Sequence, residues 1–136
     1  MVKFKFLEHT ADIKFQAFGK SLEDVFKNSA LAMFNAMYDG KVQEKEKLKF
    51  KVKGKDLEAL MYNFLEELLF LLDTKDFFLS KIKVKINKDK KSLIAEVVGN
   101  HAEDYEIHID VKAITYNEMF VKKIKDNWVS QVVLDV

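Results

Sequence analysis

The first half of the chain alternates between strand and helix patterns of hydrophobic residues. Apolar residues recur at every second position in 3–6 and 13–17, which predicts two short strands. From Leu22 to about Tyr38 they recur at helical spacing, and Ser21 with acids after it is typical of a helix N-cap. Residues 47–53 alternate strictly with lysine, which predicts a strand with one solvated face. A second helix is predicted from Leu57, after a cap at Asp56, by a broad apolar stripe.

Beyond Asp76 the pattern returns to period two. It predicts a run of antiparallel strands at about 77–88, 91–98, 105–114, 118–125 and 128–135. Two helices and many strands in this order indicate an α+β fold, with two helices packed on a mostly antiparallel sheet. At 136 residues, the chain fits one domain spanning 1–136.

Composition narrows the classes of function. Hydrophobic residues make up 49% and charged residues 33%, as in ordinary globular proteins. The chain has no cysteine, and its first residues lack the apolar stretch of a signal peptide, so we expect a cytoplasmic protein without a membrane segment. The formal net charge is +1, and all 23 basic residues are lysine. No global field draws such a protein to nucleic acid, so any RNA contact is expected to be local, indirect or weak.

Familiar catalytic and nucleotide-binding motifs are absent from the sequence. The four glycines are isolated, so there is no phosphate-binding loop or dinucleotide fingerprint. There is no serine flanked by glycines, and cysteine nucleophiles are excluded. His9, His101 and His108 lack a zinc-ligand spacing. The lysines of 47–53 and 81–85 could contact RNA phosphates, but no aromatic residue interleaves with them, which favours a solvated sheet face.

Two aspartates interrupt strand-like patterns: Asp12 before 13–17, and Asp135 near the end of the last predicted strand. Strand ends tolerate aspartate, and this is one interpretation. In the other, Asp12, Asp135 and the terminal carboxylate of Val136 converge on a hard divalent cation such as calcium or magnesium, which takes carboxylate oxygens. Such a cation would also relieve the repulsion among three carboxylates.

The predicted strand 105–114 places Glu106, His108, Asp110 and Lys112 on one face. A face with acid, histidine and lysine side chains could perform acid–base chemistry, although a solvated face is the simpler interpretation.

Several blocks in order along the chain resemble the archease family. They are Glu8-His9-Thr10-Ala11-Asp12-Ile13, Gly19-Lys20-Ser21-Leu22-Glu23, Ala32-Met33-Phe34, residues 60–69, Val111-Lys112-Ala113-Ile114-Thr115-Tyr116, and Val133-Leu134-Asp135-Val136. The resemblance covers essentially the whole chain. It implies a non-catalytic accessory protein that activates an RtcB-type tRNA-splicing RNA ligase, by promoting guanylylation and multiple turnover and by broadening nucleotide use.

The same resemblance implies site residues. Asp12, Asp135 and Val136 match the family's metal-site positions, with calcium as the preferred occupant and magnesium or manganese as alternatives. Asp12, Lys112 and Asp135 match positions implied to activate the ligase. Asn117 stands where many members carry histidine, so no role is assigned to it.

Two other functions stay open at this point. One is a metal-dependent hydrolase that uses the same carboxylates with His9 as a base. The other is a general chaperone or modulator of RNA-modifying proteins, which would act through a helix face or a sheet edge.

Overall fold

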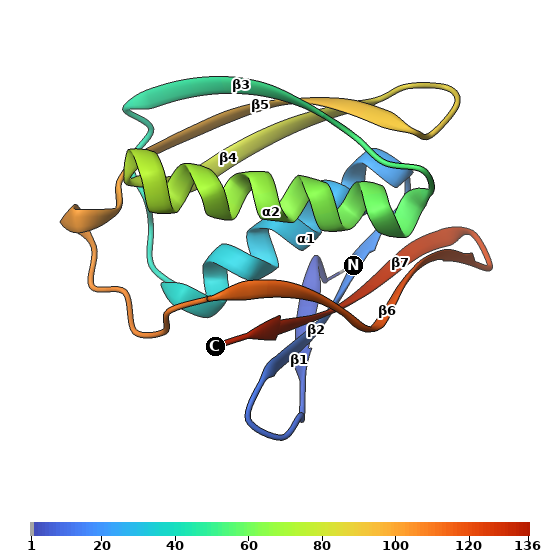
Figure 1. Cartoon of the computed structure of the whole chain (residues 1–136), viewed down its shortest axis with the longest axis horizontal. Helices are drawn as coiled ribbons and strands as arrows, with labels where there is room; N and C mark the ends of the chain where they lie inside the picture. Colours follow the sequence, from blue (N-terminus) through green and yellow to red (C-terminus); the bar gives the residue numbers. More distant parts are fainter. Residues whose placement is uncertain (1) are drawn as a thin grey trace.

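Two antiparallel sheets enclose the two helices in the computed structural model, which describes residues 2–136 (Figure 1). In chain order the elements are β1 (Phe4–Leu7), β2 (Ile13–Gly19), α1 (Leu22–Met37), β3 (Glu46–Lys53), α2 (Leu57–Lys75), β4 (Phe77–Ile86), β5 (Ser92–His101), a 3-10 turn (Ala102–Asp104), β6 (Ala113–Ile124) and β7 (Asn127–Asp135). One sheet has the strand order β1-β2-β7-β6 and the other β3-β5-β4. The α+β fold class is confirmed.

Both helices begin where the sequence predicts. The Ser21 hydroxyl accepts a hydrogen bond from the Asp24 N–H at 3.1 Å, and Asp56 Oδ1 accepts one from the Ala59 N–H at 2.8 Å. α2 ends at Asp76, whose φ of 53° is left-handed and stops the helix. Among residues 2–136, neither helix has an apolar run long enough to span a bilayer.

The core lies between the sheets because each helix contacts both of them. α1 packs on β2 and β4, and α2 packs on β6 and β3. Phe26 of α1 and Phe64 of α2 meet edge to face with ring centroids 5.5 Å apart, and both rings are fully buried. On β3, Leu48, Phe50 and Val52 pack against this core while the intervening lysines are exposed, as the alternation predicts. This shared core makes the helices a common layer for the two sheets.

Two parts of the predicted topology are wrong. The sequence predicts one sheet, whereas the structure has two. It also predicts a strand at 105–114, but 105–112 is irregular and β6 starts at Ala113 and runs through the predicted 118–125 strand. The N–H groups of this loop bond elsewhere: Tyr105 to the Ala102 carbonyl, His108 to the Met37 carbonyl. Glu106, His108, Asp110 and Lys112 are all exposed, and they form no common strand face.

Candidate functional site

The two aspartates singled out in the sequence lie at the same end of the four-stranded sheet. β2 runs antiparallel to β7, with Ile13 opposite Leu134. Asp12 immediately precedes Ile13 and Asp135 immediately follows Leu134, so the two aspartates flank the last pair of this ladder. Asp135 is exposed, and the Asp12 side chain is 33% exposed. The fold therefore places two aspartates from opposite ends of the chain at one end of the sheet.

Lys112 and Val136 join this end through the neighbouring backbone. The Lys112 N–H donates to the Asp135 carbonyl at 2.8 Å, one residue before Ala113 pairs with Asp135. The Lys112 side chain is exposed, whereas Val136 is half-buried against the core. All four residues predicted as site residues thus share one region, which we call the carboxylate end. Their roles in metal binding and partner activation stay predictions.

A tight turn leads into Asp12. The Asp12 N–H donates to the Thr10 carbonyl at 2.8 Å, and Ala11 between them has a left-handed φ of 66°. A non-glycine residue in that region costs roughly 1–2 kcal/mol. The turn is therefore held by its surroundings, and it fixes the backbone from which the Asp12 side chain projects.

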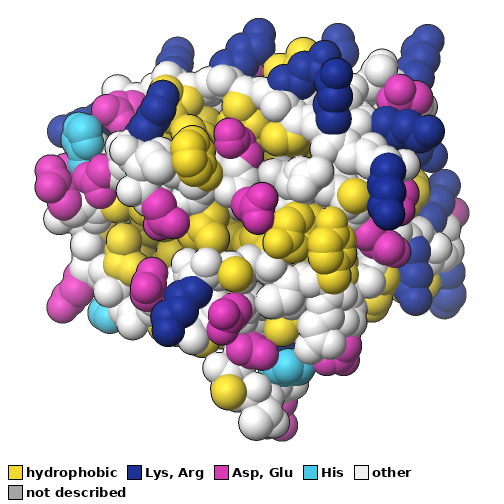
Figure 2. Space-filling view, viewed as in Figure 1, with side chains coloured by type: hydrophobic (Ala, Val, Ile, Leu, Met, Phe, Trp, Pro, Cys, Tyr) yellow, Lys and Arg dark blue, Asp and Glu magenta, His cyan; other side chains and the backbone are white. Residues whose placement is uncertain are grey.

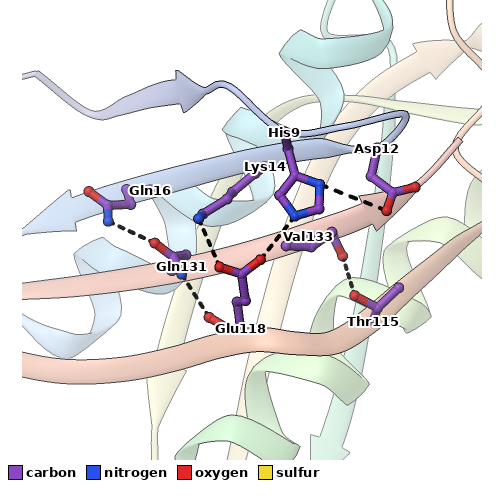
Figure 3. Close-up of polar contacts among 8 residues, drawn as sticks. All are labelled: His9, Asp12, Lys14, Gln16, Thr115, Glu118, Gln131 and Val133. Atoms are coloured by element: carbon purple, nitrogen blue, oxygen red, sulfur yellow. Dashed lines mark hydrogen bonds and ion pairs between the residues drawn. The ribbon is translucent and has the colours of Figure 1, made fainter.

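His9 lies between Asp12 and Glu118 in the close-up of the site (Figure 3). Its Nε2 is 2.9 Å from Glu118 Oε2, and Lys14 Nζ donates to Glu118 Oε1 at 3.0 Å. On the other side of the ring, Nδ1 is buried, has no hydrogen-bond partner among residues 2–136, and lies 3.9 Å from Asp12 Oδ2. Glu118 therefore holds the His9 ring so that the unpaired Nδ1 faces Asp12, a candidate metal ligand.

An irregularity in β6 sets the position of Glu118. The register of β6 against β7 shifts between Thr115 and Phe120, and Glu118 has a left-handed φ of 55°. The Glu118 carbonyl accepts a bond from Gln131 Nε2 at 2.8 Å, and Gln131 Oε1 accepts one from Gln16 Nε2 at 2.9 Å. The bulge turns Glu118 back across the sheet toward His9 (Figure 3).

The electrostatics of Glu118 favour its ionised form. The hydrogen bond from His9, and next the bond and positive charge of Lys14, lower the pKa of the Glu118 carboxyl. The negatively charged Glu118 carboxylate therefore lies on one side of the His9 ring, and Asp12 lies on the other.

A pocket of about 560 Å³ opens beside this cluster. His9, Asp12 and Lys14 line one side, and the end of α1 lines another together with His108. The bond from the His108 N–H to the Met37 carbonyl, at 3.0 Å, secures the loop that carries His108. The pocket is large enough for a side chain or a small ligand group, and it joins residues that the sequence analysis treated separately.

Glu118 and Lys14 were missed by sequence reasoning. Both fall within ordinary strand patterns, where a charged residue usually faces solvent. The only available signal was a glutamate at the start of the predicted strand 118–125, and it does not disclose a bulge. His9 was noted, but only as a histidine without ligand spacing.

The donor chemistry at the carboxylate end suits a hard divalent cation. Asp12, in the bend before β2, and Asp135, at the end of β7, offer carboxylate oxygens at one end of the sheet, and across residues 2–136 Asp135 takes part in no ion pair. No three histidine, aspartate or glutamate side chains within that range are grouped as metal ligands. Of the three residues predicted to bind a metal, only Asp12 and Asp135 have ligating side chains, and the metal site stays a prediction.

Comparison with known proteins places the chain in one family. Residues 4–136 match the model of the Archease protein family (MTH1598/TM1083). The protein archease of Pyrococcus abyssi is 40% identical over the full length of both chains, and that of Methanosarcina acetivorans is 38% identical, covering 98% of this chain and 96% of the relative.

Two solved structures share the fold. The solution structure of Methanobacterium thermoautotrophicum protein 1598 is 36% identical, with a TM-score of 0.86 over 98% of this chain and 99% of that one. The crystal structure of an archease, possible chaperone, from Thermotoga maritima has a TM-score of 0.68 at 19% identity, over 97% of this chain and 96% of that one, and shows the fold alone. On the family match and these close relatives, the chain belongs to the archease family.

Proposed function

We propose that this protein is a non-catalytic accessory protein that activates an RtcB-type tRNA-splicing RNA ligase. It promotes guanylylation and multiple turnover of the ligase and broadens its nucleotide use. Membership of the archease family supports the proposal. The observation that supports it most is that the backbones of Asp12, Lys112 and Asp135 lie at one end of the four-stranded sheet.

In this proposal the carboxylate end is the part that acts on the ligase. Asp12, Asp135 and the Val136 carboxylate would hold a divalent cation, calcium first and magnesium or manganese as alternatives. When bound, the cation supplies positive charge that neutralises phosphate oxygens. Lys112 adds an ammonium group beside them, which pairs with phosphate as a point charge. His9, fixed by Glu118, limits the positions open to the Asp12 carboxylate.

The proposal is tested with Asp12→Asn and Asp135→Asn in a multiple-turnover ligation assay with the purified ligase. Each change keeps the side-chain shape and removes one charge. We expect both variants to lose most of the activation, with ligase guanylylation measured alongside because the effect is assigned to that step. The matched control is Asp126→Asn, an exposed aspartate in the turn between β6 and β7.

Calcium binding gives a readout independent of the ligase. Calorimetric titration of the metal alone into the wild-type protein should show one site, which Asp12→Asn and Asp135→Asn weaken and Asp126→Asn does not. Appending one glycine to Val136 displaces the carboxylate and should weaken binding as well. If both site variants fold and still activate the ligase like wild type, the assignment of the carboxylate end is wrong.

A chaperone role is the second candidate, because the Thermotoga maritima relative is described as a possible chaperone. Under that role the protein suppresses aggregation of unrelated clients, and Asp12→Asn has no effect on the suppression. An aggregation assay with such a client separates the two functions.

A further inference from the structure

A stacked tyrosine pair lies on the surface where α2 packs on β6. The rings of Tyr62 and Tyr116 are 4.3 Å apart between centroids with an interplanar angle of 5°. Tyr62 is half-buried, but Tyr116 is 55% exposed. Parallel stacking fixes both rings and leaves the outer ring open to solvent. The pair is thus a rigid aromatic surface that the rest of residues 2–136 covers only in part.

Three carboxylates surround this pair. Asp56, Glu58 and Glu66 are exposed, and their charges act on the tyrosines. Partial burial, and then Glu66, raise the pKa of Tyr62; partial burial, and then Asp56 and Glu66, raise the pKa of Tyr116. None of the three carboxylates forms an ion pair in the described chain. We call these three carboxylates and the two tyrosines the tyrosine–carboxylate face.

Positive charge is concentrated elsewhere on the molecule. The protein is nearly neutral, yet seven lysines of β3 and β4 alternate along the exposed side of the three-stranded sheet, namely Lys47, Lys49, Lys51, Lys53, Lys81, Lys83 and Lys85. In Figure 2, acidic and hydrophobic side chains intermingle across the middle of the view, and lysines gather along the upper edge, which carries β3, and along the right-hand side. The tyrosine–carboxylate face is therefore locally acidic.

We propose that the tyrosine–carboxylate face is a docking surface for a basic protein surface, with a partner arginine stacking on Tyr116 and pairing with Glu66 or Glu58. An exposed aromatic face attracts a guanidinium, and neighbouring carboxylates bind it through its fork of N–H donors. The chain itself contains no arginine, so the partner must supply this group. The acidic surroundings repel RNA and leave a basic protein as the occupant.

The face lies on the same edge strand, β6, as the start of the carboxylate end. Tyr116 follows Thr115, which pairs with Val133, two residues before Asp135 on β7. Because side chains alternate along a strand, Tyr116 and Asp135 point to opposite sides of the sheet, so a partner that wraps the exposed edge of β6 would reach both. An enzyme that binds RNA needs a basic surface for the phosphates, and this chemistry complements the face. The identification of the partner as the RNA ligase rests on the proposed function; the recognition chemistry of the face does not.

The test measures the dissociation constant of two probes, an oligoarginine peptide and the purified ligase. Tyr116→Ala removes an exposed ring, and Glu66→Lys reverses one charge on the outer side of α2. We expect each variant to raise the dissociation constant of both probes on the order of tenfold, as truncation of an interface aromatic anchor does. Tyr116→Phe should restore binding. The matched control is Glu96→Lys, the same charge reversal on the lysine-covered side of β5.

The outcomes separate this proposal from the proposed function. If the wild type activates the ligase and Tyr116→Ala and Glu66→Lys bind as tightly as Glu96→Lys, the docking surface is wrong and the function stands. If the wild type does not bind the ligase but binds oligoarginine through Tyr116 and Glu66, the function fails and the surface stands. Failure of the wild type to bind either probe overturns the docking surface. So does self-association in sedimentation that Tyr116→Ala abolishes, because the occupant is then a second copy.

Discussion

Glu118 shows how one residue connects the strands of the site. Its carboxylate accepts bonds from His9, in the segment before β2, and from Lys14 on β2, although it belongs to β6. These bonds span β7, which lies between β2 and β6 in the sheet. Glu118 lies where β6 departs from regular strand geometry, with a left-handed φ of 55° inside the register shift between Thr115 and Phe120; in a regular strand its side chain would stand out from one face of the sheet.

Glu118→Gln is predicted to change the pH dependence of stability. The pKa of Glu118 is lower in the folded protein than its ordinary value of 4.5, so its contribution is complete above that pH and is lost as the pH falls through the lower folded-state pKa. In thermal melts, the Tm of the wild type should therefore be higher than the Tm of Glu118→Gln at pH 6, and this difference should close toward pH 3. Glu106→Gln, an exposed loop substitution, is the control. A gap that stays constant with pH would contradict the prediction.

At the scale of elements, one side of α2 packs into the core between the two sheets and helps to hold them together. Phe64 is fully buried against Phe26 and Phe50, with ring centroids at 5.5 and 6.2 Å. Phe70, six residues later on the same helix, is 55% exposed.

Phe64→Ala should lower the free energy of unfolding by about 3–5 kcal/mol, because it leaves a cavity between the helices and β3. Phe70→Ala should change it by less than about 0.5 kcal/mol. Urea denaturation of both variants measures the difference. Similar losses for the two would show that the buried side of α2 is misassigned.

Two glycines, Gly99 and Gly40, differ in how much room they leave for a side chain. Gly99 lies where β5 approaches β4 closely. A Cβ added at Gly99 would clash with the Phe78 carbonyl oxygen, and the backbone of a paired strand cannot yield easily. Gly99→Ala should therefore cost about 1–3 kcal/mol or more in the free energy of unfolding. At Gly40 the nearest atom is the Tyr38 hydroxyl oxygen, at the end of a movable side chain. Gly40→Ala is expected to cost less in the same denaturation series, and the reverse order would contradict the steric argument.

The elements that could be predicted from the sequence are those whose pattern has a single cause. β3 alternates because one side packs on the helices, and α1 and α2 start at residues that cap them. Residues 105–112 also alternate, but their N–H groups bond to α1, β7 and the 3-10 turn, and periodicity cannot reveal such partners. Asp12 and Asp135 could be proposed as neighbours, whereas the bulge that delivers Glu118 could not, because a register shift leaves no pattern in one sequence.

At the scale of the whole molecule, the separate sheets share one core. The buried residues run without interruption from β2 and β7 through both helices to β4 and β5. Neither sheet has an independent set of core contacts, because α1 contacts β2 and β4 alike. The fold should therefore unfold as one cooperative unit despite its two sheets.

This cooperativity can be tested with the single tryptophan. Trp128 lies on β7 in the four-stranded sheet, so its fluorescence follows that sheet, while circular dichroism at helical wavelengths follows α1 and α2. Leu79 is buried on β4 in the other sheet, and Leu79→Ala should cost about 2–5 kcal/mol. We expect the two transitions to coincide in the wild type and to shift together in Leu79→Ala, because the damage spreads through the common helical layer. If the dichroism transition moved while Trp128 fluorescence did not, the sheets would be separate folding units, and the carboxylate end could stay ordered without β4.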